Sequence, residues 1–164
     1  MSITKRLTMI FVVLVLCVGC DQTTKFAAES YLPADGMLTF LGGVLRLQLA
    51  HNHGAFLGLG ASLPEVLRDG FFSLGVGIVL LGLLGYALFS KSITQLELVA
   101  FAMLFAGGVS NLADRLMGGG SVIDFINIGF GSMHTGIFNV ADMVITLAAL
   151  MLFLGLLAER NKTH

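Results

Sequence analysis

Four largely apolar stretches, separated by polar segments, make up most of the chain. The longest uncharged one, residues 70–90, has 21 residues, and a helix needs about 20 apolar residues to cross a bilayer core of about 30 Å. The other three are shorter between charges, so each must bring its bounding charged residues to the membrane edge. We therefore predict four transmembrane helices, at about residues 7–27, 70–90, 97–115 and 139–158.

The segment between the first two helices has a different pattern. In residues 44–50, VLRLQLA, leucine alternates with other residues at every second position, which is typical of a half-buried strand. Ser62 followed by Glu65 is the signature of a helix N-terminus. We expect a small extracytoplasmic sheet and a short interfacial helix within about residues 38–69, and an outer loop at residues 116–138.

Composition places these helices in a membrane. Hydrophobic residues are 56% of the chain and charged residues 12%, whereas a soluble domain has about 45–50% and about 25%. The predicted fold class is an all-α polytopic membrane protein, with residues 1–164 forming a single membrane domain. A net charge of −1 gives no basic field, so nucleic acid is not an expected partner.

Basic residues are distributed unevenly between the two sides of this four-helix arrangement. An even number of spans puts both termini on one side, and that side holds Lys5, Arg6, Lys91, Arg160 and Lys162. The positive-inside rule therefore places both termini in the cytoplasm.

Three aspartates are expected to reach a similar depth near the outer surface. Counted from the charged residue at the other end of each helix, Asp21, Asp114 and Asp142 lie 15, 17 and 17 residues along. Asp124 belongs to the loop on the same side. Because ionisable residues at membrane depth are costly, their convergence indicates a functional site.

The chemistry of this site rests on residues that share helix faces. Asn111, Asp114 and Arg115 share one face of the third helix, and Asp114 with Arg115 could form a structural ion pair. Asn139 and Asp142 share a face of the fourth helix. All five are therefore expected at the same outer end of the bundle.

Asp124 and Asp142 are the carboxylates best placed for catalysis. Two carboxylates close together in a poorly hydrated site cannot both ionise, so one keeps a proton. The ionised one can activate a water while the protonated one polarises a carbonyl. From spacing alone, a proteolytic site is not favoured over an ion-coupled transporter site or a carboxylate metal site. A membrane assembly factor that uses the outer segment as a docking surface is a third alternative.

The N-terminal stretch VLVLCVGCDQTTK, residues 13–25, resembles the end of a bacterial lipoprotein signal, with Cys20 as the residue to be lipidated. Cleavage before Cys20 would remove most of the first helix, which we expect to form a wall of the acidic site next to Asp21 and Lys25. We therefore expect an uncleaved first span. His51 and His53 alternate on the predicted strand, but no third ligand has suitable spacing, so no metal is expected.

Five motifs, in this order, make the chain resemble the bacterial lipoprotein signal peptidases (signal peptidase II). Together the motifs span nearly the whole chain. One departure is Ser110, which stands where that family usually has glycine. The motifs are DQTTK (Asp21–Lys25), HNHGAF (His51–Phe56), GGVSNLADR (Gly107–Arg115), VIDFI (Val122–Ile126) and FNVADMVI (Phe138–Ile145).

The resemblance implies an aspartic endopeptidase without a cofactor, in which Asp124 and Asp142 are the catalytic pair. Asp114 would have a structural role. The implied substrates are prolipoproteins cut before a diacylglyceryl-modified cysteine, at the outer face of the bacterial inner membrane. Membrane lipid is the other expected partner, and the enzyme is expected to be a monomer. Substrate-binding or supporting roles fall on Asp21, Lys25, Asn52, Gly54, Asn111, Arg115, Asn139 and Ala141.

Overall fold

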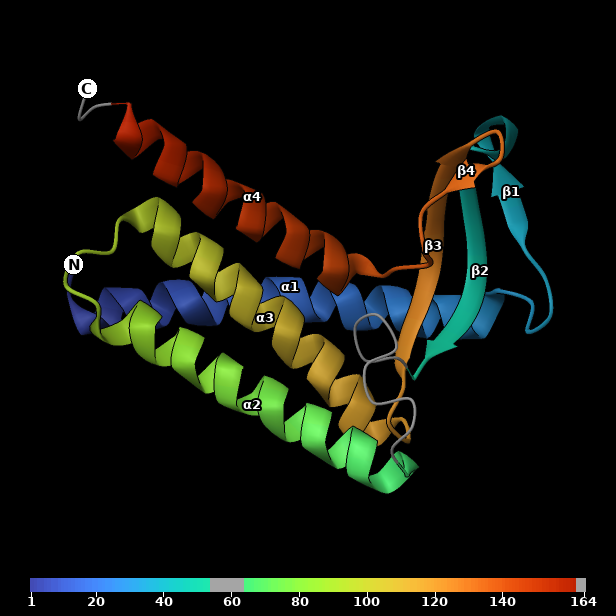
Figure 1. Ribbon diagram of the computed structural model, residues 1–164, viewed down its shortest axis with the longest axis horizontal. Coiled ribbons are helices and arrows are strands. Elements are labelled where there is room, and N and C mark those ends of the chain that lie inside the picture. The colour runs from blue at the N-terminus through green and yellow to red at the C-terminus, as the bar shows by residue number, and fades with distance from the viewer. Residues whose placement is uncertain (54–63, 162–164) are drawn as a thin grey trace.

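The computed structural model describes residues 1–53 and 64–161, which form four α-helices and a small antiparallel sheet. The sheet lies across one end of the helices, and both chain termini lie at the other end (Figure 1). This arrangement confirms the predicted fold class. The helices are α1 (Ile3–Tyr31), α2 (Glu65–Phe89), α3 (Gln95–Met117) and α4 (Val140–Arg160). The strands are β1 (Leu38–Phe40), β2 (Leu45–Asn52), β3 (Val122–Phe130) and β4 (Met133–His134), and a 3-10 turn, η1 (Leu41–Gly43), joins the first two.

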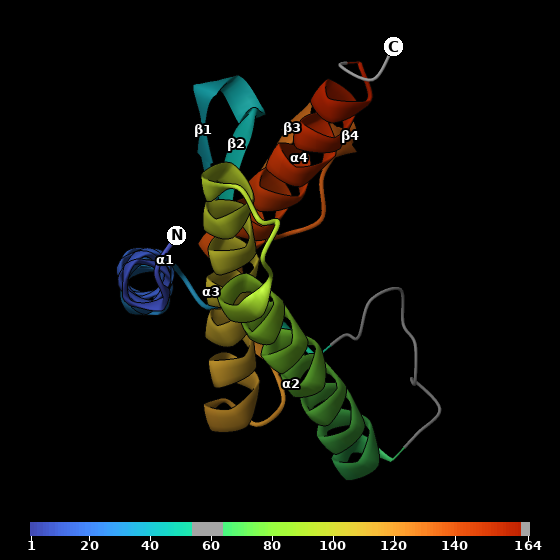
Figure 2. The same cartoon turned by 90° about the vertical axis from the view of Figure 1, so that its left-hand side faces the viewer.

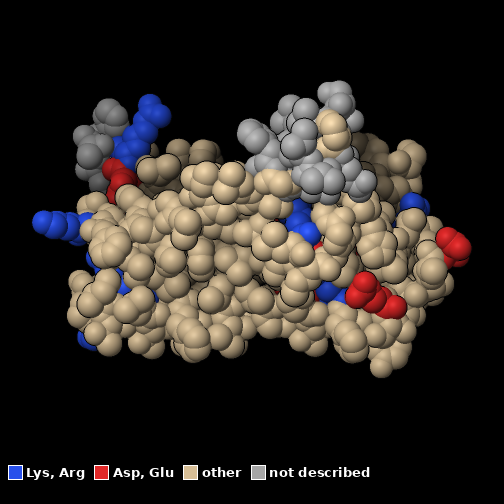
Figure 3. Space-filling view, turned by 90° about the horizontal axis from the view of Figure 1, so that it is seen from below, with Lys and Arg blue, Asp and Glu red and all other residues tan. Residues whose placement is uncertain are grey.

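The helix surfaces match a bilayer environment. Among the residues described, α1, α3 and α4 are long and apolar enough to cross a membrane, and the apolar part of α2 covers Ser73–Phe89. The outer surfaces of the helices carry large exposed apolar side chains, such as Leu16, Phe11 and Leu81. On the face seen in Figure 3, charged residues gather towards the two ends and leave an uncharged band between them.

Helix α2 differs from the prediction of a separate interfacial helix. Ser62, its predicted N-cap, lies outside the described residues. The helix begins at Glu65 and runs as one helix to Phe89, so residues 65–69 belong to α2 itself. At the opposite end, the Arg6 guanidinium donates hydrogen bonds to the carbonyl oxygens of Ala87 (3.1 Å) and Leu88 (3.0 Å). It thereby satisfies carbonyls that the end of a helix leaves without a partner.

Helix α3 lies at the centre of the bundle, between α1, α2 and α4 (Figure 2). Two adjacent glycines permit this close packing. A Cβ on Gly107 would lie 2.7 Å from Ile145 Cγ1 and 2.8 Å from the Ala141 carbonyl oxygen of α4, and a Cβ on Gly108 would overlap the Leu80 side chain of α2. Small residues are the usual means of bringing transmembrane helices together.

Adding a methyl group at Gly107 is therefore expected to destabilise the protein. Because Gly107→Ala presses on a backbone atom of α4, we expect a loss of about 1–3 kcal/mol, the usual cost of overpacking. Gly155→Ala is the matched control, because a Cβ there meets nothing within 4 Å. Thermal unfolding of both variants in detergent checks this, and equal melting temperatures would contradict the close α3–α4 contact.

The sheet has the order β1-β2-β3-β4, with each neighbouring pair antiparallel. The predicted loop at residues 116–138 is in part a strand, because β3 pairs along β2 and places Asp124 opposite Ala50. Its sequence, VIDFINIGF, is rich in β-branched residues, which favour strands. The register is interrupted between Leu47 and Ala50. A further bridge joins Ile126 to Phe138 and leads the chain into α4.

Candidate active site

The polar residues singled out from the sequence converge where the sheet meets the helices. Ala141 lies with them in the first turn of α4, and Gly54 lies outside the described residues. The elements contribute Asp21 and Lys25 (α1), Asn52 (β2), Asn111, Asp114 and Arg115 (α3), Asp124 (β3), and Asn139, Ala141 and Asp142 (the start of α4).

Asp124 is held by amide donors in a buried position. Its side chain is only 2% exposed. Asn52 Nδ2 donates to one carboxylate oxygen at 2.9 Å, and Asn139 Nδ2 donates to the other at 2.7 Å. Burial raises the pKa of Asp124 to about 6, the nearby Asp142 carboxylate adds to the rise, and the two amide donors and Lys25 oppose it. Asp124 therefore holds its proton up to a higher pH than an ordinary aspartate does.

Asp142 has a different environment at the N-terminus of α4. It forms a capping box with Asn139: Asp142 N–H donates to Asn139 Oδ1 at 2.9 Å, and Asn139 N–H donates to Asp142 Oδ2 at 3.2 Å. Asn111 Nδ2 donates to the other oxygen at 2.9 Å. The carboxylate thus accepts one backbone and one side-chain hydrogen bond at the N-terminal end of α4, the positive end of a helix dipole.

Two asparagine amides join the aspartates. Asn139 Nδ2 contacts both Asp124 Oδ1 and Asn111 Oδ1, the latter at 3.1 Å. Asn111 Oδ1 also accepts a hydrogen bond from Lys25 Nζ at 2.9 Å. Because its oxygen faces these donors, the NH₂ group of Asn111 must face Asp142. The orientation of each amide is thus fixed by what its other end contacts.

Next to Asn111 lies an ion cluster that links α1, α3 and α4. Lys25 Nζ is 2.6 Å from Asp21 Oδ2 and 2.6 Å from Asp114 Oδ2, and the Lys25 side chain is 1% exposed. Asp21 Oδ1 accepts a hydrogen bond from the Ala141 backbone N–H at 2.8 Å. The cluster therefore fixes the first turn of α4, which carries Asp142, against α1.

The ion pair suggested for Asp114 and Arg115 is not the one that the structure forms. Asp114 pairs with Lys25 of α1, while the Arg115 guanidinium donates to the Asn111 carbonyl oxygen at 3.3 Å in its own helix. Consecutive residues on a helix point in different directions. The partner of Asp114 therefore comes from a neighbouring helix.

Sequence reasoning missed two residues of this cluster. Gln22 Nε2 donates to Asp114 Oδ1 at 2.7 Å, and Ser110 Oγ donates to Asp21 Oδ2 at 2.7 Å. Gln22 belongs to the DQTTK motif, so its place in that motif could have identified it as a site residue. Ser110 was noted only as a departure from the usual glycine, yet its hydroxyl makes a bond that glycine could not.

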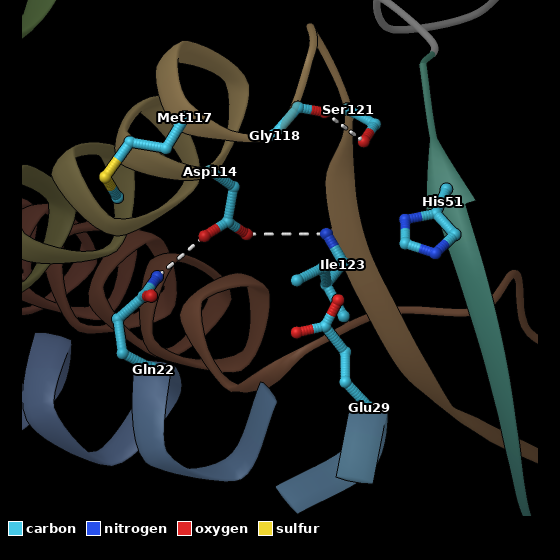
Figure 4. Close-up of a pocket in the computed structure, with 8 residues that line it drawn as sticks. All are labelled: Gln22, Glu29, His51, Asp114, Met117, Gly118, Ser121 and Ile123. Atoms are coloured by element: carbon cyan, nitrogen blue, oxygen red, sulfur yellow. Dashed lines mark hydrogen bonds between the residues drawn. The ribbon is translucent and has the colours of Figure 1, made fainter. Parts of the chain in front are cut away.

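Two hollows reach this site. A groove of about 440 Å³ follows α4 from Asp142, and it is lined by Phe138, Met143, Thr146, Leu147 and Leu150. A second pocket, of about 250 Å³, is lined by Asp114 and, among others, by Gln22, Glu29 and His51. There, Asp114 lies between Gln22 and the Ile123 backbone N–H, which donates to it at 3.4 Å (Figure 4). The first groove leads from Asp142 along an apolar helix surface.

Comparison with known proteins agrees with this architecture. Residues 13–158 match the sequence family described as signal peptidase (SPase) II. The lipoprotein signal peptidase of Pelodictyon phaeoclathratiforme is 34% identical over 154 residues, covering 88% of this chain and 87% of that protein. The lipoprotein signal peptidase of a Sulfurihydrogenibium species is 37% identical over 147 residues, covering 88% and 85%.

A solved structure has the same fold. It is described as a bacterial membrane enzyme determined by the in meso method at 2.3 Å resolution, and it superposes with a TM-score of 0.80 at 26% identity. The similarity covers 94% of this chain and 91% of that chain. The shared fold therefore includes both the membrane helices and the sheet that carries Asp124.

Proposed function

Because this chain belongs to the signal peptidase II family, we propose that it is an intramembrane aspartic endopeptidase that cuts prolipoproteins before their diacylglyceryl-modified cysteine. Family membership makes it a multi-pass membrane peptidase of lipoprotein processing. The aspartic mechanism rests on one observation: Asn139 donates hydrogen bonds to both Asp124 and Asp142, and Asp142 also lines an apolar groove.

We assign the proton to Asp124 and the negative charge to Asp142. Asp124 is buried on a strand, whereas Asp142 is half-buried at a helix N-terminus, where its carboxylate accepts from the Asn139 backbone N–H and from Asn111 Nδ2. In this scheme Asp142 takes a proton from a water, whose oxygen bonds to the scissile carbonyl carbon. Asp124 gives its proton to the carbonyl oxygen. When the C–N bond breaks, Asp142 returns its proton to the leaving nitrogen and Asp124 recovers the other from the collapsing intermediate.

The groove along α4 supports an apolar substrate that approaches from within the membrane. Its lining is mostly apolar. Met143, Leu147 and Leu150 are each about half exposed on the outer side of α4. Lipid chains of the substrate would enter sideways between helices. The apolar signal peptide would lie along α2 to α4 and bring the scissile bond to the aspartates.

We propose that the site faces the outer side of the bacterial inner membrane and that both termini lie in the cytoplasm. The arrangement is consistent with this, because Lys5, Lys91 and Arg160 lie at the end opposite the sheet (Figure 1). A monomer would suffice, since the residues of the proposed mechanism all come from one chain.

A cell-free assay with purified protein tests the proposal. A model prolipoprotein would be supplied with and without its diacylglyceryl group, each with and without a chelator. We expect cleavage of the lipidated form alone, at the bond before the modified cysteine, with the same rate in chelator. Cleavage that stops in chelator would overturn the aspartic mechanism, and equal cleavage of both forms would overturn the substrate assignment.

The pH dependence of kcat/KM follows from the raised pKa of Asp124. A carboxyl with a pKa of about 6 holds its proton below that pH and loses it above. We therefore expect kcat/KM to fall above pH 6 as Asp124 ionises, by about tenfold per pH unit at the limit. Asn52→Ala removes a hydrogen bond that favours the ionised form, so the falling limb should move to higher pH.

Gln48→Ala is the matched control for this shift. Gln48 lies on the same strand as Asn52 and is exposed. Its replacement should leave the pH profile of kcat/KM unchanged. Superimposable profiles for Asn52→Ala and Gln48→Ala would show that Asp124 is not the titrating group.

A further inference from the structure

The end of the sheet that points away from the helices is made of exposed apolar residues. We call it the sheet tip, and it consists of the β1–β2 turn (Phe40–Gly43) and the β3–β4 hairpin (Phe130–Met133). Phe130 and Met133 face each other across that hairpin, and each is 81% exposed. Leu41 is 77% exposed. Exposed apolar residues that gather in one place mark interaction sites.

The two turns form one continuous surface. Leu45 of β2 pairs with Ile128 of β3, and the Gly129 N–H donates to the Val44 carbonyl oxygen at 2.9 Å. Cross-strand neighbours such as Phe130 and Met133 have their side chains on the same face. The β3–β4 hairpin therefore presents Phe130 and Met133 on one face, and the β1–β2 turn that carries Leu41 lies at the same end of the sheet.

Leu41 is held in a backbone conformation that leucine rarely adopts. Its φ is +53°, in the left-handed region where glycine is favoured and a bulky residue is uncommon. Gly42 follows it in the same region, with a φ of +64°. A leucine kept here, and exposed, indicates that its side chain serves a contact.

The sheet tip itself carries no charged residue. Residues 36–45 and 128–138 contain no Asp, Glu, Lys or Arg, and Arg46 follows them on β2, opposite Thr39 of β1. Edge strands that face water usually carry charges, which prevent pairing with other chains. β1 and β4 are the two edges of this sheet and carry none, which suits an apolar environment better than water.

The position of the sheet tip identifies that environment. The strands run across the ends of the helices, and the tip projects beyond the N-terminal end of α4 (Figure 1). Residues 135–139 connect β4 directly to α4, whose exposed side chains Met143, Leu147 and Leu150 face the membrane. The tip is thus joined by a five-residue connection to the N-terminal end of a spanning helix whose exposed face is apolar.

From these exposed apolar side chains and their position beyond the end of α4 we infer that the sheet tip inserts Leu41, Phe130 and Met133 into the interfacial region of the lipid bilayer. The tip then acts as a second membrane contact beside the helices. Apolar side chains without nearby charge enter the headgroup and acyl-chain boundary readily. The inference concerns where the sheet lies, so it does not depend on the catalytic assignment.

Depth-dependent quenching in vesicles tests the insertion. Full-length protein with Cys17→Ala and Cys20→Ala would carry one new cysteine, Met133→Cys, labelled with an environment-sensitive fluorophore. It would be reconstituted in phosphatidylethanolamine and phosphatidylglycerol vesicles that contain lipids with a nitroxide near the top of the acyl chain. Asp35→Cys is the matched control, because Asp35 is exposed in the α1–β1 connection outside the tip.

We expect the nitroxide lipid to quench the probe at 133 at least threefold more strongly than the probe at 35, and iodide in the buffer to do the reverse. Equal quenching of the two probes by iodide, with no effect of the nitroxide lipid at 133, would overturn the inference. A second experiment places the probe at Leu41→Cys and adds Phe130→Ser with Met133→Ser. Lipid quenching at 41 should then fall by at least half at an unchanged melting temperature, and unchanged quenching would contradict a shared insertion.

Discussion

Replacing Asp124 by asparagine is expected to abolish cleavage of a lipidated prolipoprotein. Asparagine has the same shape but cannot give a proton to the carbonyl oxygen, and a positioned acid or base contributes about 10²- to 10⁴-fold to a rate. We expect kcat to fall by about 10³-fold or more, with KM nearly unchanged. Asp142→Asn should have an equal effect, because it removes the base that activates water. Gel-based cleavage of a purified substrate measures both.

The fold should survive these changes. At Asp124 the new amide keeps one oxygen to accept from Asn52 or Asn139 but turns its NH₂ group towards the other donor. The loss of about one hydrogen bond costs about 1 kcal/mol. Asp35→Asn, in the exposed α1–β1 connection, is the matched control and should cleave normally. Near-normal processing by either variant of the pair would rule out the two-aspartate mechanism.

The arrangement of the membrane helices could be predicted from hydrophobic length and charge spacing. A bilayer core of about 30 Å admits few alternatives to a helix of about 20 apolar residues. Counting residues from one charged end therefore placed Asp21, Asp114 and Asp142 at a common depth, and the structure does bring them together. In a membrane, the number of residues from one end of a helix therefore predicts how deep a side chain lies.

The partners within the site could not be predicted in the same way. Asp124 was expected in a loop, but β3 gains its pairing from β2, more than seventy residues earlier in the chain. No local pattern records such a pairing, because the residues that pair are far apart in the sequence. Similarly, counting residues along each helix predicts that Lys25 and Asp114 lie at the same depth in the membrane. It does not predict which faces of α1 and α3 contact each other. That depends on how closely Gly107 and Gly108 let α3 approach its neighbours.

Replacing Lys25 by methionine should destabilise the protein more than any other single change to a supporting residue. Methionine is apolar and of similar length, so the space stays filled while the ammonium is lost. Asp21 is then left 0% exposed and Asp114 6% exposed, both without the cation that each contacts at 2.6 Å. Removing one partner of a buried ion pair costs about 3–5 kcal/mol. Chemical unfolding in detergent measures this loss.

A second change separates the lost charge from the lost packing. In Lys25→Met combined with Asp114→Asn, one of the two stranded carboxylates is gone, so the double variant should be more stable than Lys25→Met alone. Lys91→Met, at an exposed lysine between α2 and α3, should be nearly neutral. If Lys25→Met unfolds at the same denaturant concentration as Lys91→Met, the cluster does not stabilise the fold. Where the single variant stays folded, its kcat should still fall, because Asn111 loses the donor that keeps its NH₂ group facing Asp142.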